Sequence, residues 1–137
     1  FLKGNHERML LQSLGYEEAL FQKDIYDLWL YNGGRETIIG YLHRNKTFDC
    51  LPDDITIKKL KELIPKEHIE FMQSCKDYHW EGDDFFFVHG GCNPFVPLND
   101  HEKDVFYWDR SLVKFMQNCT PADSIPAINH HQYGAWL

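Results

Sequence analysis

Phe85-Phe86-Phe87-Val88 runs directly into His89-Gly90-Gly91, and the fold class of this 137-residue chain follows from these seven residues. A run of four apolar residues is typical of a β-strand that is covered on both faces within a layered structure. The two glycines and the proline at position 94 mark an irregular loop directly after the strand. Because functional groups gather where the strands of open α/β sheets end, we expect His89 to lie at a functional site.

Leu2-Lys3-Gly4-Asn5-His6-Glu7 repeats this arrangement of a strand end followed by a polar loop that contains glycine. An amide oxygen from Asn5 and imidazole nitrogens suit borderline ions such as Mn, Fe or Zn. The alternative is purely structural. Asn5 and His6 then form a polar turn before a helix whose first turn carries Glu7, and His89 is a solvated loop histidine.

The spacing of apolar residues predicts the other elements of the chain. Periods of three and four residues indicate helices over residues 17–31, 35–42, 57–64, 66–74 and 104–117. Alternation and turn residues indicate a hairpin of two strands, 76–80 and 85–88. The predicted fold is therefore a single α/β domain, or a portion of one, over residues 1–137.

Three details of these helices are open to a structural check. The first helix is predicted to bury one face, made of Phe21, Ile25, Leu28 and Trp29, and to end at the cap Asn32-Gly33-Gly34. The turn Pro52-Asp53-Asp54 is expected to cap the helix that follows it. Trp108 is predicted to be a core residue of the last helix.

Composition and charge exclude several classes of protein. The chain is 43% hydrophobic and 15% aromatic, which is ample for a core and argues against disorder. A net charge of −7 argues against a non-specific nucleic-acid binder. With no long apolar run and no signal peptide, a cytoplasmic protein without a membrane partner is expected.

The remaining polar residue types are assigned no chemistry. The four cysteines form no C-x-x-C pair and are predicted to be reduced thiols. Four histidines without ligand spacing are expected at the surface, namely His43, His68, His79 and His101. The pairs Asp53-Asp54 and Asp83-Asp84 flank turns, where Asp bonds the local backbone.

Four segments in order resemble motifs of the calcineurin-like metallophosphoesterases, in the serine/threonine-type protein phosphatase branch of bacteria and phages. Gly4-Asn5-His6-Glu7 and Val88-His89-Gly90-Gly91 are similar to its third and fourth signature motifs. Residues 29–37 resemble the W-L-x-N-G-G-x-x-T segment between them, although its Asn-Gly-Gly is expected to shape the rim of the site rather than to contact a ligand. Tyr107-Trp108-Asp109-Arg110 resembles the downstream W-x-R segment, so the likeness spans residues 1–110.

The resemblance implies a two-metal hydrolase on a four-layer α/β/β/α fold, of which this chain lacks the N-terminal strands. Asn5 and His89 would bind one metal of the pair, and His6 would act as general acid. The cofactors would be two divalent ions, with Mn expected and Fe or Zn as alternatives. Two such ions clamp the phosphate and activate the attacking hydroxide.

Arg110 is the fourth candidate site residue. A guanidinium matches two phosphate oxygens, so Arg110 is a candidate for binding the substrate phosphate during catalysis. The alternative is an ordinary ion pair with Glu102, Asp104 or Asp109.

The chain also departs from the family pattern. The motifs D-x-H and G-D-x-x-D-R precede G-N-H in the family, and residue 1 lies too close to Asn5 for either to fit. The final G-H motif has no match, since Asn118-Cys119-Thr120-Pro121 carries Cys at the His position and the surroundings of His130 and His131 do not resemble it. Two hypotheses follow. The first is a phosphoesterase acting on phosphorylated proteins or on dinucleoside polyphosphates, and the second is a non-catalytic binding or regulatory domain.

Overall fold

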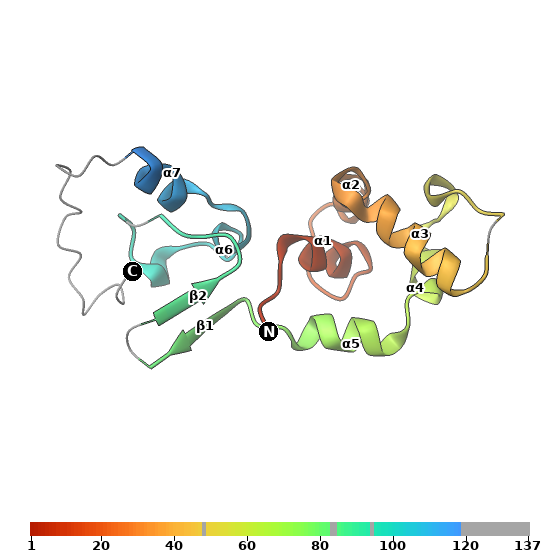
Figure 1. The fold of residues 1–137 in the computed structure, drawn as a ribbon, viewed down its shortest axis with the longest axis horizontal. Coiled ribbons are helices and arrows are strands. Elements are labelled where there is room, and N and C mark those ends of the chain that lie inside the picture. Colours follow the sequence, from red (N-terminus) through yellow and green to blue (C-terminus); the bar gives the residue numbers. More distant parts are fainter. Residues whose placement is uncertain (48, 83–84, 94, 119–137) are drawn as a thin grey trace. The chain divides into compact units, whose positions relative to one another are not determined.

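The computed structural model describes residues 1–47, 49–82, 85–93 and 95–118. These residues mix helices with a two-stranded antiparallel sheet, as the predicted α/β class requires (Figure 1). The chain divides into two compact units. We call His6–Cys75 the helical unit, and Phe1–Asn5 with Lys76–Leu137 the strand unit. Within the described ranges, no helix has both the length and the apolar character needed to cross a bilayer.

The helical unit is a set of short helices around one apolar core. Its elements are α1 (Asn5–Ser13), α2 (Gln22–Trp29), η1 (Leu30–Gly34), α3 (Arg35–Arg44), η2 (Pro52–Asp54), α4 (Ile57–Leu63) and α5 (Lys66–Ser74). The core is formed mainly by aliphatic side chains from all the α-helices, among them Leu11, Leu14, Trp29, Ile38, Leu60 and Ile69. The four helices predicted for this part of the chain are confirmed in order as α2 to α5, and α1 is a further helix that the apolar spacing did not predict.

Helix α2 begins later than predicted and turns a different face to the core. Phe21 precedes the helix and is 69% exposed, and Leu28 is 43% exposed, so the predicted burial of these two side chains is wrong. Tyr26 and Trp29 are buried, and the Tyr26 hydroxyl donates a hydrogen bond to the carbonyl of Ile55. That buried bond turns the Tyr26 face inward, which leaves Leu28 outside.

The segment Asn32-Gly33-Gly34 ends α2 through a kink. Gly33 has φ of +103°, a conformation that glycine adopts without strain. At Gly34 a Cβ would lie 2.5 Å from the Trp29 ring, so only glycine lets the indole pack against the backbone there. Helix α3 then starts directly at Arg35, as predicted.

The cap of α4 comes from Thr56 and not from the turn at residues 52–54. The Thr56 Oγ1 accepts a hydrogen bond from the Lys59 amide at 3.3 Å. Pro52–Asp54 forms the predicted turn, and Asp53 makes a surface ion pair with Arg35 at 2.7 Å. Asp83 and Asp84 lie outside the described residues.

The strand unit contains β1 (Tyr78–Glu81) and β2 (Phe85–Val88), paired with Tyr78 opposite Val88 and Glu81 opposite Phe85. Leu2 forms an isolated parallel bridge with Lys76, just before β1. Because side chains alternate along a strand, Phe86 and Val88 share one face of the hairpin and pack beside Phe106. This face belongs to the second apolar cluster of the chain, which is centred on Cys92, Phe106 and Tyr107.

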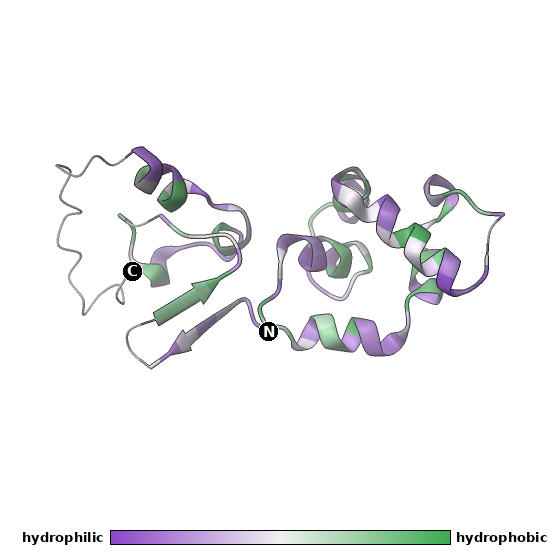
Figure 2. Ribbon diagram, viewed as in Figure 1, coloured by the Kyte–Doolittle hydropathy of each residue, from purple (hydrophilic) through white to green (hydrophobic). Residues whose placement is uncertain are grey.

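The prediction that β2 is covered on both faces is wrong. Phe85 and Phe87 lie on the opposite face from Phe86 and are each 48% exposed. The hydropathy colouring shows β2 as strongly apolar although one of its faces is open (Figure 2). The continuous apolar run therefore predicted the strand correctly, but it did not predict that one face of the strand is exposed.

The predicted helix over residues 104–117 is two helices, α6 (Val105–Trp108) and α7 (Ser111–Asn118), after the short turn η3 (Leu98–Asp100). Asp109 is extended, and its Oδ1 accepts hydrogen bonds from the Ser111 amide at 2.9 Å and hydroxyl at 2.6 Å. Such side-chain bonds to nearby backbone compete with helix continuation. The break leaves Trp108 45% exposed, so its predicted core position is wrong, and Tyr107 is buried instead.

Candidate functional site

Asn5 and His89 meet although 84 positions separate them in the chain. The Asn5 Oδ1 lies 3.0 Å from the His89 Nε2. Asn5 is the first residue of α1, and His89 directly follows β2. Asn5 is partly buried and His89 is exposed, so the pair lies at the surface of the strand unit.

Main-chain hydrogen bonds hold the two segments that carry this pair. The Lys3 amide donates to the Lys76 carbonyl at 2.8 Å, and the Lys76 amide donates to the Phe1 carbonyl at 3.1 Å. The Gly90 amide donates to the Phe106 carbonyl at 2.6 Å. The positions of Asn5 and His89 thus follow from backbone pairing of their immediate neighbours.

The donor pair suits one edge of a metal site. Neighbouring ligand atoms bonded to one octahedral ion at about 2.1 Å lie about 3 Å apart. The 3.0 Å between the Asn5 oxygen and the His89 nitrogen matches that spacing, and it is also an ordinary hydrogen-bond length. Among the described residues no group of three or more His, Cys, Asp and Glu side chains gathers. Cys119, His130 and His131 lie outside the described part of the chain.

Arg110 lies beside the loop that carries His89. A Cβ at Gly90 would sit 2.8 Å from the Arg110 Nη1, so the guanidinium reaches the residue next to His89. The same Nη1 donates to the Asp109 carbonyl at 2.9 Å. This bond to Asp109 goes to its main-chain carbonyl and not to its carboxylate, whose Oδ1 accepts from Ser111. Arg110 is an exposed residue.

His6 is the second residue of α1 and is exposed. It begins the helical unit, and its link to the Asn5–His89 pair is the peptide bond to Asn5. The structure therefore brings Asn5 and His89 into contact and places Arg110 beside Gly90, the residue after His89, whereas His6 is linked to Asn5 through the chain.

A charged cluster in the strand unit was missed by sequence reasoning. The Asp77 carboxylate lies 3.6 Å from the Lys3 Nζ and 2.6 Å from the Lys103 Nζ, and it accepts a hydrogen bond from the Tyr107 hydroxyl. Lys3 is only 5% exposed. The sequence signal for this ion pair is Lys3. It is a charged residue in a predicted strand end, directly before Gly4.

The ionisation of Asp77 reflects these neighbours. Burial by itself raises the pKa of the carboxyl group. Hydrogen bonds from Lys103 and Tyr107, with the charges of Lys103 and Lys3, outweigh burial and hold the Asp77 pKa below its ordinary value. Asp77 is therefore a carboxylate at neutral pH, matched to two ammonium groups.

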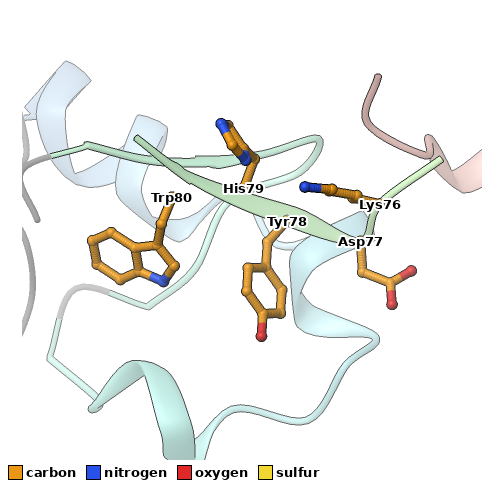
Figure 3. Close-up of a pocket in the computed structure, with 5 residues that line it drawn as sticks. All are labelled: Lys76, Asp77, Tyr78, His79 and Trp80. Carbon is orange, nitrogen blue, oxygen red and sulfur yellow. The ribbon is translucent and has the colours of Figure 1, made fainter. Parts of the chain in front are cut away.

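The strand unit has two hollows whose linings include neither Asn5 nor His89. The first, of about 540 Å³, is lined by residues 76–80, and Figure 3 shows His79 on the opposite side of β1 from Tyr78 and Trp80. The second, of about 460 Å³, lies over the exposed face of the hairpin, where it is lined by Phe1, Leu2, Lys76, His79, Glu81 and Phe87. Neither hollow includes a predicted site residue.

The other histidines are only partly as predicted. His43 is exposed, but His68 is half-buried, with its Nδ1 2.9 Å from the Tyr41 hydroxyl. His101 is also half-buried and accepts a hydrogen bond from the Asn93 amide at 3.1 Å, and His79 is half-buried against Phe87. All of these partners are structural ones.

The described cysteines are free thiols, as predicted. Cys50 is exposed, whereas Cys75 and Cys92 are buried. Burial, helped by the charge of Asp109, raises the pKa of Cys92 to about 12. Cys92 is therefore a packing residue and not a nucleophile.

No protein-family model, curated protein or solved structure matches this chain. Any functional assignment therefore rests on the residues themselves and on the motifs that they resemble.

Proposed function

We propose that this chain contributes part of the active site of a metal-dependent phosphoesterase, of the serine/threonine phosphatase type within the calcineurin-like metallophosphoesterases. The observation that carries the proposal is the meeting of Asn5 Oδ1 and His89 Nε2 at 3.0 Å. The four-layer fold of that superfamily is part of the same proposal. Asn5 and His89 are the two residues that the motif resemblance singles out as ligands of one metal, and their proximity was not used in making that choice.

In this proposal Asn5 and His89 hold one of two divalent ions, with manganese expected and iron or zinc as alternatives. When bound, the ions supply Lewis-acid polarisation of the phosphate and activation of water. Further ligands must come from outside the described residues, because these two supply fewer donors than a catalytic ion takes from protein.

His6 and Arg110 act on the substrate. Arg110 binds the phosphoryl group through its planar guanidinium, which suits two phosphate oxygens. His6 donates a proton to the oxygen of the leaving alcohol, a step usually worth about 10²–10⁴-fold in rate. The substrates are phosphorylated proteins, or dinucleoside polyphosphates if the second branch of the family is the nearer one.

Metal binding tests the ligand assignment in the complete protein that carries these residues. Calorimetric titration with Mn²⁺ is expected to show binding that Asn5→Ala and His89→Ala each weaken at least about tenfold. His43→Ala is the matched control, because it removes an exposed imidazole from the helical unit. Binding that is equal in all four proteins would show that Asn5 and His89 are not ligands.

Turnover of two classes of phosphate ester tests the roles of the two histidines. His89→Ala is expected to lose metal and turnover together. His6→Asn is expected to keep its metal and to lose about 10²–10⁴-fold in turnover of alkyl phosphates, with a smaller loss for aryl phosphates, whose leaving groups need less protonation. Equal losses for both ester classes at full metal occupancy would remove the general-acid role of His6.

The alternative, a non-catalytic binding domain, is favoured by the absence of a gathered His, Cys, Asp and Glu cluster in the described ranges. It predicts no Mn²⁺ binding and no hydrolysis of either ester by the complete protein. The same titration therefore separates the two functions.

A further inference from the structure

Asp77 lies where three segments of the strand unit come together. Its carboxylate contacts Lys3 from the N-terminal segment and Tyr107 and Lys103 from α6 and the loop before it. Asp77 itself lies between the Leu2–Lys76 bridge and the start of β1. One side chain thus connects the N-terminal segment, the hairpin and α6.

These segments are the ones that carry the candidate ligands. Lys3 stands two residues before Asn5, and its own amide bonds the carbonyl of Lys76, the neighbour of Asp77. Tyr107 follows Phe106, whose carbonyl accepts the Gly90 amide next to His89. The distance between Asn5 and His89 therefore depends on how the N-terminal segment and α6 are held against the hairpin.

Breaking the ion pair between Asp77 and Lys3 is expected to destabilise the strand unit because Lys3 is buried. The Lys3 side chain is 6% exposed, whereas that of Lys103 is 52% exposed. A buried ammonium that loses its carboxylate partner is far less tolerable than a surface ammonium that does so. The Lys3 and Tyr107 contacts of Asp77 should accordingly matter, and the Lys103 contact should matter little.

We propose that Asp77 is a positioning residue that fixes Asn5 and His89 relative to each other by holding Lys3 and Tyr107 on one carboxylate. For metal binding, this inference rests on the proposed function. For the geometry of the Asn5–His89 pair it stands alone.

The test compares Asp77→Asn with Lys103→Gln in the complete protein. Asp77→Asn keeps the shape of the side chain and loses its charge, and Lys103→Gln removes only the exposed partner. Tyr107→Phe, which deletes one hydroxyl, is the milder second variant should Asp77→Asn melt too low. Thermal melts by circular dichroism establish that each variant is folded at the temperature of measurement.

Two readouts are used, and one needs no metal. The first is the Mn²⁺ dissociation constant. It is expected to rise about tenfold for Asp77→Asn, the low end of what residues that support metal ligands contribute, and to change less than about twofold for Lys103→Gln. The second is the NMR signals of the Asn5 side-chain amide and the His89 ring in metal-free protein. They are expected to shift in Asp77→Asn and Tyr107→Phe but not in Lys103→Gln.

The outcomes separate this inference from the proposed function. If wild-type protein binds no Mn²⁺, the proposed function fails, and shifted Asn5 and His89 signals in folded Asp77→Asn still support the positioning role. If wild type binds Mn²⁺ and folded Asp77→Asn and Tyr107→Phe keep both the affinity and the signals, the positioning role is overturned while the proposed function stands. Equal effects of Lys103→Gln and Asp77→Asn would also overturn it, because a general charge effect would then suffice.

Discussion

Replacing Gly90 with alanine tests how closely the His89 loop approaches α6. A Cβ at position 90 would lie 2.7 Å from the Tyr107 carbonyl carbon and 2.8 Å from the Phe106 oxygen. Carbon atoms normally stay about 3.5–4.0 Å apart, so the loop must move by roughly 1 Å. Both atoms in the way are backbone, and backbone yields less readily than the end of a side chain.

The expected cost follows from two contributions. Overpacking of this kind costs about 1–3 kcal/mol, and loss of the 2.6 Å hydrogen bond from the Gly90 amide to Phe106 adds about 0.5–1.5 kcal/mol. The lower entropy of the unfolded alanine chain returns about 0.4–1 kcal/mol. The net destabilisation lies between about 0.5 and 4 kcal/mol and is centred near 2 kcal/mol, a central value that lowers Tm by roughly 7 °C for a chain of this size.

Gly40→Ala is the matched control for the same chemical change. Gly40 lies inside α3, and a Cβ there meets no atom within 4 Å. Alanine is favoured over glycine in a helix by about 0.8–1.0 kcal/mol, so this variant should melt higher than wild type. Urea unfolding and thermal melts measure both variants, and a Gly90→Ala protein within about 0.5 kcal/mol of wild type would refute the close approach of the loop to α6.

Three further outcomes are expected. Phe106→Ala should cost about 3–5 kcal/mol because Phe106 is buried, whereas Phe87→Ala should cost clearly less because that side chain is 48% exposed; equal losses in urea unfolding would contradict the assignment of the open face. Iodoacetamide at pH 8 should label exposed Cys50 in the native protein and spare Cys92, whose pKa is raised to about 12, and mass spectrometry showing equal labelling would contradict that burial. The pKa of Asp77 in the folded state is lowered from 3.8, so its contribution to stability is present above about pH 4 and is lost as the pH falls through the folded-state pKa. Asp77→Asn should therefore weaken the dependence of the unfolding free energy on pH below about 4. An unchanged pH dependence would argue against the Lys3 and Lys103 contacts.

Local patterns predicted local structure well in this chain. The four apolar residues of β2 and the helical spacing of α3, α4 and α5 are read from neighbouring positions, and all four elements formed where expected. The single helix over residues 104–117 failed because one side chain, Asp109, satisfies the Ser111 amide and hydroxyl and ends α6. Periodicity does not register that competition, and so Trp108 was placed in the core.

The contacts of the candidate site, unlike the helices and strands, could not be predicted from local patterns. Nothing in the spacing of Asn5 and His89 indicates that they touch, and only their places after two predicted strands and the motif resemblance link them in the sequence. Asp77 was not singled out at all, because its partners stand at positions 3, 103 and 107 and the link between them exists only in three dimensions. Long-range contacts of this kind leave no periodic trace in a single sequence.

The contacts that hold Asn5 and His89 differ in kind from those that hold the hairpin. The pair depends on main-chain bonds at Lys3 and Gly90 and on the carboxylate of Asp77, whereas β1 and β2 depend on the apolar face that packs beside Phe106. Backbone bonds fix position to fractions of an ångström, and apolar packing mainly supplies free energy without direction. A change on the face of β2 that packs beside Phe106 should thus alter mainly stability, while a change at Gly90 or Asp77 should move the pair even where the fold survives. The position of the pair is for that reason set by main-chain and carboxylate contacts, and a change at Gly90 alters both position and stability.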